Sequence, residues 1–121
     1  MLIVWFDSLS YCSGEVTLVG GNEGSGNVFV DGKPVCDDNW SIEDGEVACR
    51  QLGYQGVSKI TTNSHFGQVN TEKNPFGMNN VECDGSEDFL LNCRHDDNIG
   101  EGTCGASEAA GVYCIAGTVF V

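Results

Sequence analysis

Seven cysteines in 121 residues are the feature that most constrains how this chain can fold. No two of them have Cys-x-x-Cys spacing, so zinc-ribbon and thioredoxin-like folds lose their main sequence support. Scattered cysteines at this density are typical of secreted chains, in which they oxidise in pairs. We therefore expect an extracellular, disulfide-bonded domain. The cysteines are Cys12, Cys36, Cys49, Cys83, Cys93, Cys104 and Cys114.

The chain length fits about one domain on the usual ~100–200 residue scale. A domain of this size buries a smaller fraction of its surface than a large one, so covalent cross-links help to stabilise it. Because the number of cysteines is odd, one thiol is free, pairs with another chain, or has lost its partner. Six paired cysteines alone allow fifteen connectivities, and the residues leave that choice open.

Eighteen acidic and five basic residues give the chain a formal net charge of −13. A field of this sign repels nucleic acid, other polyanions and anionic membranes. We therefore expect no direct binding of nucleic acid. A polyanionic ligand requires a bound cation that locally reverses the charge.

The first residues, Met1–Phe6, form an apolar run that is too short for the core of a secretory signal. No stretch approaches the ~20 apolar residues of a membrane span. We expect no membrane span in this sequence, which reads as a piece of a longer chain. The predicted organisation is a tail over 1–13, a domain over 14–116 and a tail over 117–121.

One convincing helix is predicted over residues 42–52. Ser41 is a suitable N-cap, and Asp44 stands three residues later as a short version of the capping box. Apolar residues then recur at helical spacing, and Gly53 is placed to end the helix. Short β-rich runs predict strands over 16–19, 27–30, 33–36, 57–61, 78–83 and 111–115, and a short helical turn within 84–94.

Six motifs together resemble the scavenger receptor cysteine-rich domain, in the family's order and at near-family spacing over residues 15–115. No single motif is specific, but the combination is. The motifs are VTLVGG (16–21), VCDDNW (35–40), VACRQLGY (47–54), VECDGSE (81–87), LLNC (90–93) and CGASEAAGVYC (104–114).

The resemblance implies a small disulfide-rich α+β domain in which a curved antiparallel β-sheet cradles one helix. It also implies the six-cysteine group, because Tyr54 stands where the eight-cysteine group has a cysteine. Cys12 is then the surplus thiol, unpaired or bonded to another chain. The implied disulfides are Cys36–Cys104, Cys49–Cys114 and Cys83–Cys93.

A calcium site is predicted at Asp37, Asp38 and Glu108. If Cys36 bonds Cys104, their Cα atoms lie about 5.5 Å apart, which brings Glu108 toward the two aspartates. Three crowded carboxylates repel one another, and a hard cation with oxygen ligands relieves that repulsion. The resemblance implies the same trio. The alternative is an ordinary solvated acidic surface.

A weaker second cation site is predicted at Asn79 and Asn80. In the family an acidic pair commonly precedes the Val-x-Cys motif, whereas this chain has two asparagines there. Amide oxygens can bind calcium, but without their charge the affinity falls.

Catalysis finds no support in the sequence, and the chain is not expected to be an enzyme. There is no Gly-x-Ser-x-Gly elbow and no His-Glu-x-x-His motif. The two histidines, His65 and His95, lie in polar segments where an exposed imidazole is expected.

The segment 69–77 is longer than the family usually has. It is either a tolerated surface excursion or a specificity loop with Phe76 as an exposed anchor.

The sequence is compatible with three functions. The first is a scavenger or pattern-recognition module that binds polyanionic or microbial surface ligands through calcium. The second is an adhesion module that binds a cell-surface protein through loops near Phe66 and Phe76. The third is a passive domain of a larger secreted protease or amine oxidase.

Overall fold

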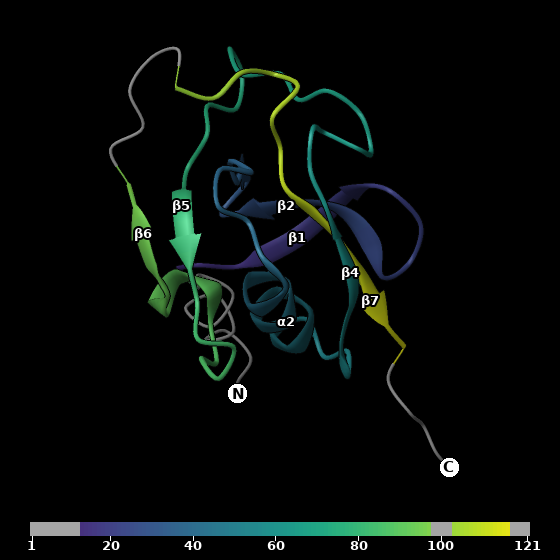
Figure 1. The fold of residues 1–121 in the computed structure, drawn as a ribbon. Coiled ribbons are helices and arrows are strands. Elements are labelled where there is room, and N and C mark those ends of the chain that lie inside the picture. Colours follow the sequence, from purple (N-terminus) through teal and green to yellow (C-terminus); the bar gives the residue numbers. More distant parts are fainter. Residues whose placement is uncertain (1–12, 98–102, 117–121) are drawn as a thin grey trace, which may run out of the picture.

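The structure, a computed structural model, describes residues 13–97 and 103–116, which contain seven strands, one α-helix and one short 3₁₀ helix (Figure 1). In chain order these are β1 (Val16–Gly20), β2 (Ser25–Val30), β3 (Lys33–Pro34), α2 (Ile42–Gln51), β4 (Gly56–Thr61), β5 (Asn79–Glu82), η1 (Leu90–Asn92), β6 (Arg94–Asp96) and β7 (Gly111–Ile115).

The main sheet is antiparallel and has the strand order β1-β2-β7-β4, with β3 paired to the end of β2. The β1–β2 hairpin is in register from Val16 opposite Val30 to Gly20 opposite Gly26. The β2–β3 turn places Asp31 and Gly32 at φ 53° and 81°, the left-handed conformation that a tight two-residue turn requires. Strands β5 and β6 form a separate two-stranded antiparallel sheet.

The helix α2 packs against one face of the main sheet (Figure 1). Val47, Ala48 and Cys49 are fully buried in the main core, together with Val28 of β2. Gly45 allows close approach, because a Cβ there would lie 2.7 Å from the Ile60 side chain on β4. The sheet and α2 confirm the predicted α+β class, and α2 ends one residue before the predicted limit.

A second, smaller core lies on the opposite side of the β1–β2 hairpin. Val69 and Phe76 pack there with the Cys36–Cys104 disulfide and Ala109, and Phe29 of β2 closes the cluster. Phe76 is only 8 % exposed, so the prediction of an exposed anchor at this residue is wrong. The segment 69–77 is fixed because its apolar residues cover the outer face of the sheet.

Strand β6 and the environment of His95 differ from the sequence prediction. Residues 94–96 pair with β5 although they are polar, because the Cys83–Cys93 disulfide holds the two segments together. The side chain of His95 is only 11 % exposed, with Nε2 2.8 Å from Asp97 Oδ1. His65 is exposed, as expected.

A buried carboxylate joins the helix to the rest of the fold. Asp44 is fully buried, and its Oδ2 accepts hydrogen bonds from the backbone N–H and the hydroxyl of Ser41, at 2.8 and 3.0 Å. Its Oδ1 accepts a 2.7 Å bond from the backbone N–H of Cys83. The capping residue therefore also fixes the chain at a disulfide 39 residues away.

We expect Asp44→Ala to lower the free energy of unfolding by about 2–4 kcal/mol, because it leaves two backbone N–H groups without acceptors. Urea denaturation measures the loss. The matched control is Glu43→Ala on the exposed side of the same turn, which should stay within about 0.5 kcal/mol of wild type. Equal losses in the two variants would contradict the role of Asp44.

A pH dependence follows from the same residue, because burial raises the pKa of Asp44 although three hydrogen bonds oppose the rise. The folded state then binds a proton more tightly than the unfolded state. The stabilising contribution is full below the ordinary aspartate pKa and is lost as pH rises through the folded-state pKa. Wild type should lose stability relative to Asp44→Asn as the pH rises above the ordinary aspartate pKa in denaturation experiments. Parallel curves would refute this assignment.

Candidate metal centre

Asp37, Asp38 and Glu108 converge at the surface, each offering a carboxylate oxygen within 4.8 Å of the others. They come from two segments about seventy residues apart in the sequence. Asp37 and Asp38 follow the strand β3, and Glu108 lies shortly before β7. The structure therefore brings together the trio that the sequence predicts.

Main-chain contacts place the two acidic segments side by side. The backbone N–H of Asp37 donates a 2.9 Å hydrogen bond to the carbonyl of Glu108, and Cys36 and Ala109 form an isolated antiparallel bridge. The Cys36–Cys104 disulfide, with a Cα–Cα distance of 6.1 Å, fastens the same two segments. The carboxylates are thus held together by the backbone rather than by their own side-chain interactions.

Backbone N–H groups orient two of the carboxylates. Asn63 donates a 2.7 Å bond to Asp37 Oδ2, and Gly105 donates a 2.5 Å bond to Glu108 Oε1. These bonds engage one oxygen of each carboxylate, and the second oxygen of each can bind a cation. Hydrogen bonding of this kind preorganises a site, because the side chains lose less freedom on binding.

Ser64 supports the site, a role that no sequence pattern indicated. Its hydroxyl donates a 2.8 Å bond to the carbonyl of Ala106 and accepts a 2.9 Å bond from the N–H of Ala109. Asn63 and Ser64 both have positive φ, at 58° and 49°. This turn after β4 aims the Asn63 N–H at Asp37. A polar Asn-Ser pair after a strand indicates a turn, but it does not indicate which residues the turn contacts.

The electrostatics of the cluster favour a bound cation. Burial raises the pKa of Asp37, and the neighbouring carboxylates Asp38 and Glu108 raise it further, against the opposing hydrogen bond from Asn63. Both neighbours destabilise the charged form of Asp37. A divalent cation reverses this effect, and carboxylate oxygens are the ligands that calcium prefers.

Asn79 and Asn80 of the predicted second site lie at the start of β5. The Asn79 side-chain oxygen accepts a bond from the N–H of Asn80, and the Asn80 oxygen accepts one from Asn39 Nδ2, both at 2.8 Å. The Asn80 amide also donates to Asp96 at 2.8 Å. Both amide oxygens are already engaged, so a cation competes with these hydrogen bonds. The second site stays a prediction.

Three disulfides cross-link the described residues in the pattern that the resemblance implies: Cys36–Cys104, Cys49–Cys114 and Cys83–Cys93. The second disulfide connects α2 to β7.

Trp40, beside the acidic pair, belongs to the core, and its indole N–H donates a 3.0 Å bond to the carbonyl of Gly111. Cys12 lies outside the described residues, and its pairing stays a prediction.

Comparison with known proteins identifies the family. Residues 6–115 match the family profile of the Scavenger receptor cysteine-rich domain. The chain belongs to the scavenger receptor cysteine-rich (SRCR) family.

The SRCR chain is 41 % identical over 104 residues to the mouse protein "Macrophage scavenger receptor types I and II", covering 82 % of this chain and 22 % of that protein. It is also 41 % identical over 108 residues to a "Scavenger receptor cysteine-rich domain superfamily protein" of Patiria pectinifera, covering 85 % and 9 % respectively. The chain therefore spans less than a quarter of the length of either relative.

Two solved structures share the fold. The third SRCR domain of murine neurotrypsin is 39 % identical, with a TM-score of 0.71 over 83 % of this chain and 94 % of that one. The SRCR domain of mouse MARCO in its dimeric form is 26 % identical, with a TM-score of 0.56 over 84 % of each chain.

Membership of the family answers three sequence predictions. SRCR domains are non-catalytic modules, so the chain is not an enzyme. The family supports an extracellular ligand-binding module, and the three disulfides agree with its six-cysteine type. Within the described residues, no helix is long and apolar enough to cross a membrane.

Removing individual disulfides tests whether Cys36–Cys104, unlike Cys83–Cys93, holds the carboxylate cluster together. In the chain-entropy model, replacing both cysteines by serine should cost about 4 kcal/mol for Cys36–Cys104 and about 3 kcal/mol for Cys83–Cys93. Only the first replacement should shift the pKa of Asp37 toward its ordinary range, because only that bridge fastens the carboxylates together. Carboxyl NMR titration of the folded variants measures this. Equal shifts in both variants would contradict the role of Cys36–Cys104.

Proposed function

We propose that this SRCR domain is a calcium-dependent binding module of the scavenger or pattern-recognition type. Its ligands are polyanionic or microbial surface molecules. Asp37, Asp38 and Glu108 hold the ion. The observation that carries the proposal is the convergence of these three carboxylates within 4.8 Å.

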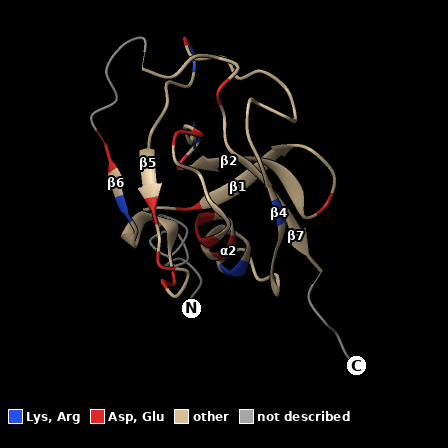
Figure 2. Cartoon of the chain, viewed as in Figure 1, with Lys and Arg blue, Asp and Glu red and all other residues tan. Residues whose placement is uncertain are grey.

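The net charge of −13 explains why the proposal needs a cation. Figure 2 shows Asp and Glu residues on α2 and the surrounding loops, with few Lys or Arg residues among them. An anionic ligand is repelled by such a surface. A bound calcium ion supplies local positive charge and coordination positions that phosphate, sulfate or carboxylate groups of a ligand can occupy.

The donor set fits calcium better than magnesium. Calcium takes six to eight oxygen ligands in flexible geometry, whereas magnesium demands a near-ideal octahedron and keeps several waters. Three carboxylates from two segments supply fewer ligands than calcium accepts, so positions are left for water or a ligand. The name of the mouse relative, a macrophage scavenger receptor, supports a scavenger-type role.

We expect Glu108→Gln to weaken calcium binding by at least about tenfold, because it removes one of three charged ligands. Isothermal titration calorimetry of the full 121-residue chain measures this. The matched control is Glu23→Gln in the β1–β2 turn, which removes the same charge outside the carboxylate cluster and should leave the affinity unchanged.

A second experiment measures ligand binding with dextran sulfate, a polyanion of defined chemistry. Retention of wild type on dextran sulfate should require calcium and be lost in chelator or in Glu108→Gln. Undiminished retention in chelator would refute the calcium bridge. It would instead favour the adhesion or accessory-domain functions, which need no cation.

A further inference from the structure

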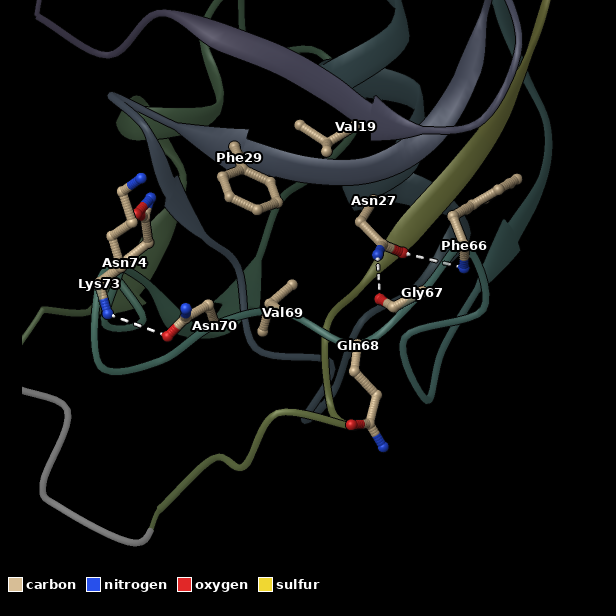
Figure 3. A pocket seen from close by; sticks show the side chains of 10 residues that line it. All are labelled: Val19, Asn27, Phe29, Phe66, Gly67, Gln68, Val69, Asn70, Lys73 and Asn74. Carbon is tan, nitrogen blue, oxygen red and sulfur yellow. Dashed lines mark hydrogen bonds between the residues drawn. The ribbon is translucent and has the colours of Figure 1, made fainter.

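A groove runs along the outer face of the β1–β2 hairpin, on the side away from α2 (Figure 3). Antiparallel pairing puts Val19 opposite Asn27, and Phe29 lies two residues further on the same face. Residues 66–70, together with Lys73 and Asn74, form the facing wall. The volume is about 410 Å³, within the ~300–1,000 Å³ typical of ligand pockets.

The facing wall is fixed by hydrogen bonds at both ends. At one end Asn27 Nδ2 donates a 2.8 Å bond to the carbonyl of Gly67, and at the other Asn74 Nδ2 donates a 3.2 Å bond to the carbonyl of Gly32. Between them the Asn70 side-chain oxygen accepts bonds from two backbone N–H groups of the turn. The groove is therefore preformed, which lowers the entropic cost of binding.

Half of the ten lining residues are polar, and one of these, Lys73, is a cation. Val19 is 45 % exposed, and Phe29 and Val69 also belong to the apolar half of the lining. Phe66 lies at the other end, against Tyr113 with ring centroids 5.1 Å apart. Lys73 and Asn74 lie together at the opposite end (Figure 3).

Charge distinguishes the groove from the rest of the molecule. None of its ten lining residues is acidic, although Glu72 is next to Lys73 in the sequence. Lys73 is one of the five basic residues of the chain. Lys73 forms no ion pair with any residue that the structure describes. The groove therefore accepts a carboxylate that the remaining surface repels.

The edge position of β1 favours a polypeptide over other anions. Within the described part of the chain, β2 is the one strand that pairs with β1. An extended peptide can hydrogen-bond to an open edge and place alternate side chains into a neighbouring groove. An acidic sugar or a lipid surface makes no such main-chain pairing, and the aliphatic floor suits an aliphatic side chain.

We propose that the groove between β1–β2 and residues 66–74 is a calcium-independent docking site for an extended acidic segment of a protein partner. An aliphatic side chain of the segment packs on Val19 and Phe29, and a carboxylate next to it pairs with Lys73. The site is separate from the carboxylate cluster and does not depend on the proposed function.

The probe is the peptide acetyl-Gly-Leu-Glu-Gly-amide, titrated in chelator into the ¹⁵N-labelled full chain. Backbone amide resonances of Val19, Asn70 and Lys73 should shift saturably below about 10 mM peptide. The same peptide with Gln in place of Glu should bind roughly threefold more weakly, because the exposed ion pair contributes modestly.

Lys73→Glu should weaken binding of the Glu peptide by roughly fivefold and strengthen binding of the matching Lys peptide. The matched control is Arg94→Glu, an exposed residue on β6 that gives the same change in net charge outside the groove. It should leave both affinities within about twofold. Unchanged spectra elsewhere show that both variants fold.

Absence of saturable shifts in the groove would overturn the proposal. Equal weakening by Lys73→Glu and Arg94→Glu would overturn it too, because binding would then follow net charge alone. Glucuronate, titrated in parallel, should give no saturable shifts. If glucuronate shifted the groove amides and the peptide did not, an acidic sugar rather than a polypeptide would be the ligand.

Discussion

The Cys36–Cys104 disulfide is the constraint on which the functional surface depends. It fastens the segment after β3 to the segment before β7, across 68 residues of sequence. The main-chain bond between Asp37 and Glu108 follows from that proximity, and so does the crowding of three carboxylates. The same disulfide forms the centre of the second core, where Val69 and Phe76 are buried. One covalent bond thus stabilises both the carboxylate cluster and the wall of the groove.

The two proposed binding surfaces differ in charge. The carboxylate cluster concentrates negative charge, and backbone hydrogen bonds keep it in place against the mutual repulsion. A cation there allows anionic ligands to approach a chain of charge −13. The groove needs no cation, because its lining contains no acidic residue and carries Lys73 at one end. An acidic domain can in this way hold ligands at two sites of different chemistry.

Local patterns in the sequence predicted the elements that depend on local forces. The helix follows from the Ser41–Asp44 cap and the periodic apolar residues, and the hairpin turn follows from Asp31–Gly32. What the sequence did not reveal depends on long-range packing. Phe76 looked exposed because nothing local indicates that its loop folds back over Phe29. β6 was missed because its pairing is imposed by a disulfide rather than by β-propensity.

The carboxylate trio itself was predictable, because the family motifs contain it, but its supports were not. Asn63 and Ser64 reach the site only through a turn with positive φ after β4.

The most direct test of the calcium site is a calcium titration of the wild-type chain followed by amide NMR. The N–H resonances of Asn63 and Gly105, which donate to Asp37 and Glu108, should shift together and saturate at one ion per chain. If millimolar calcium left both resonances unmoved, the carboxylate cluster would not be a calcium site.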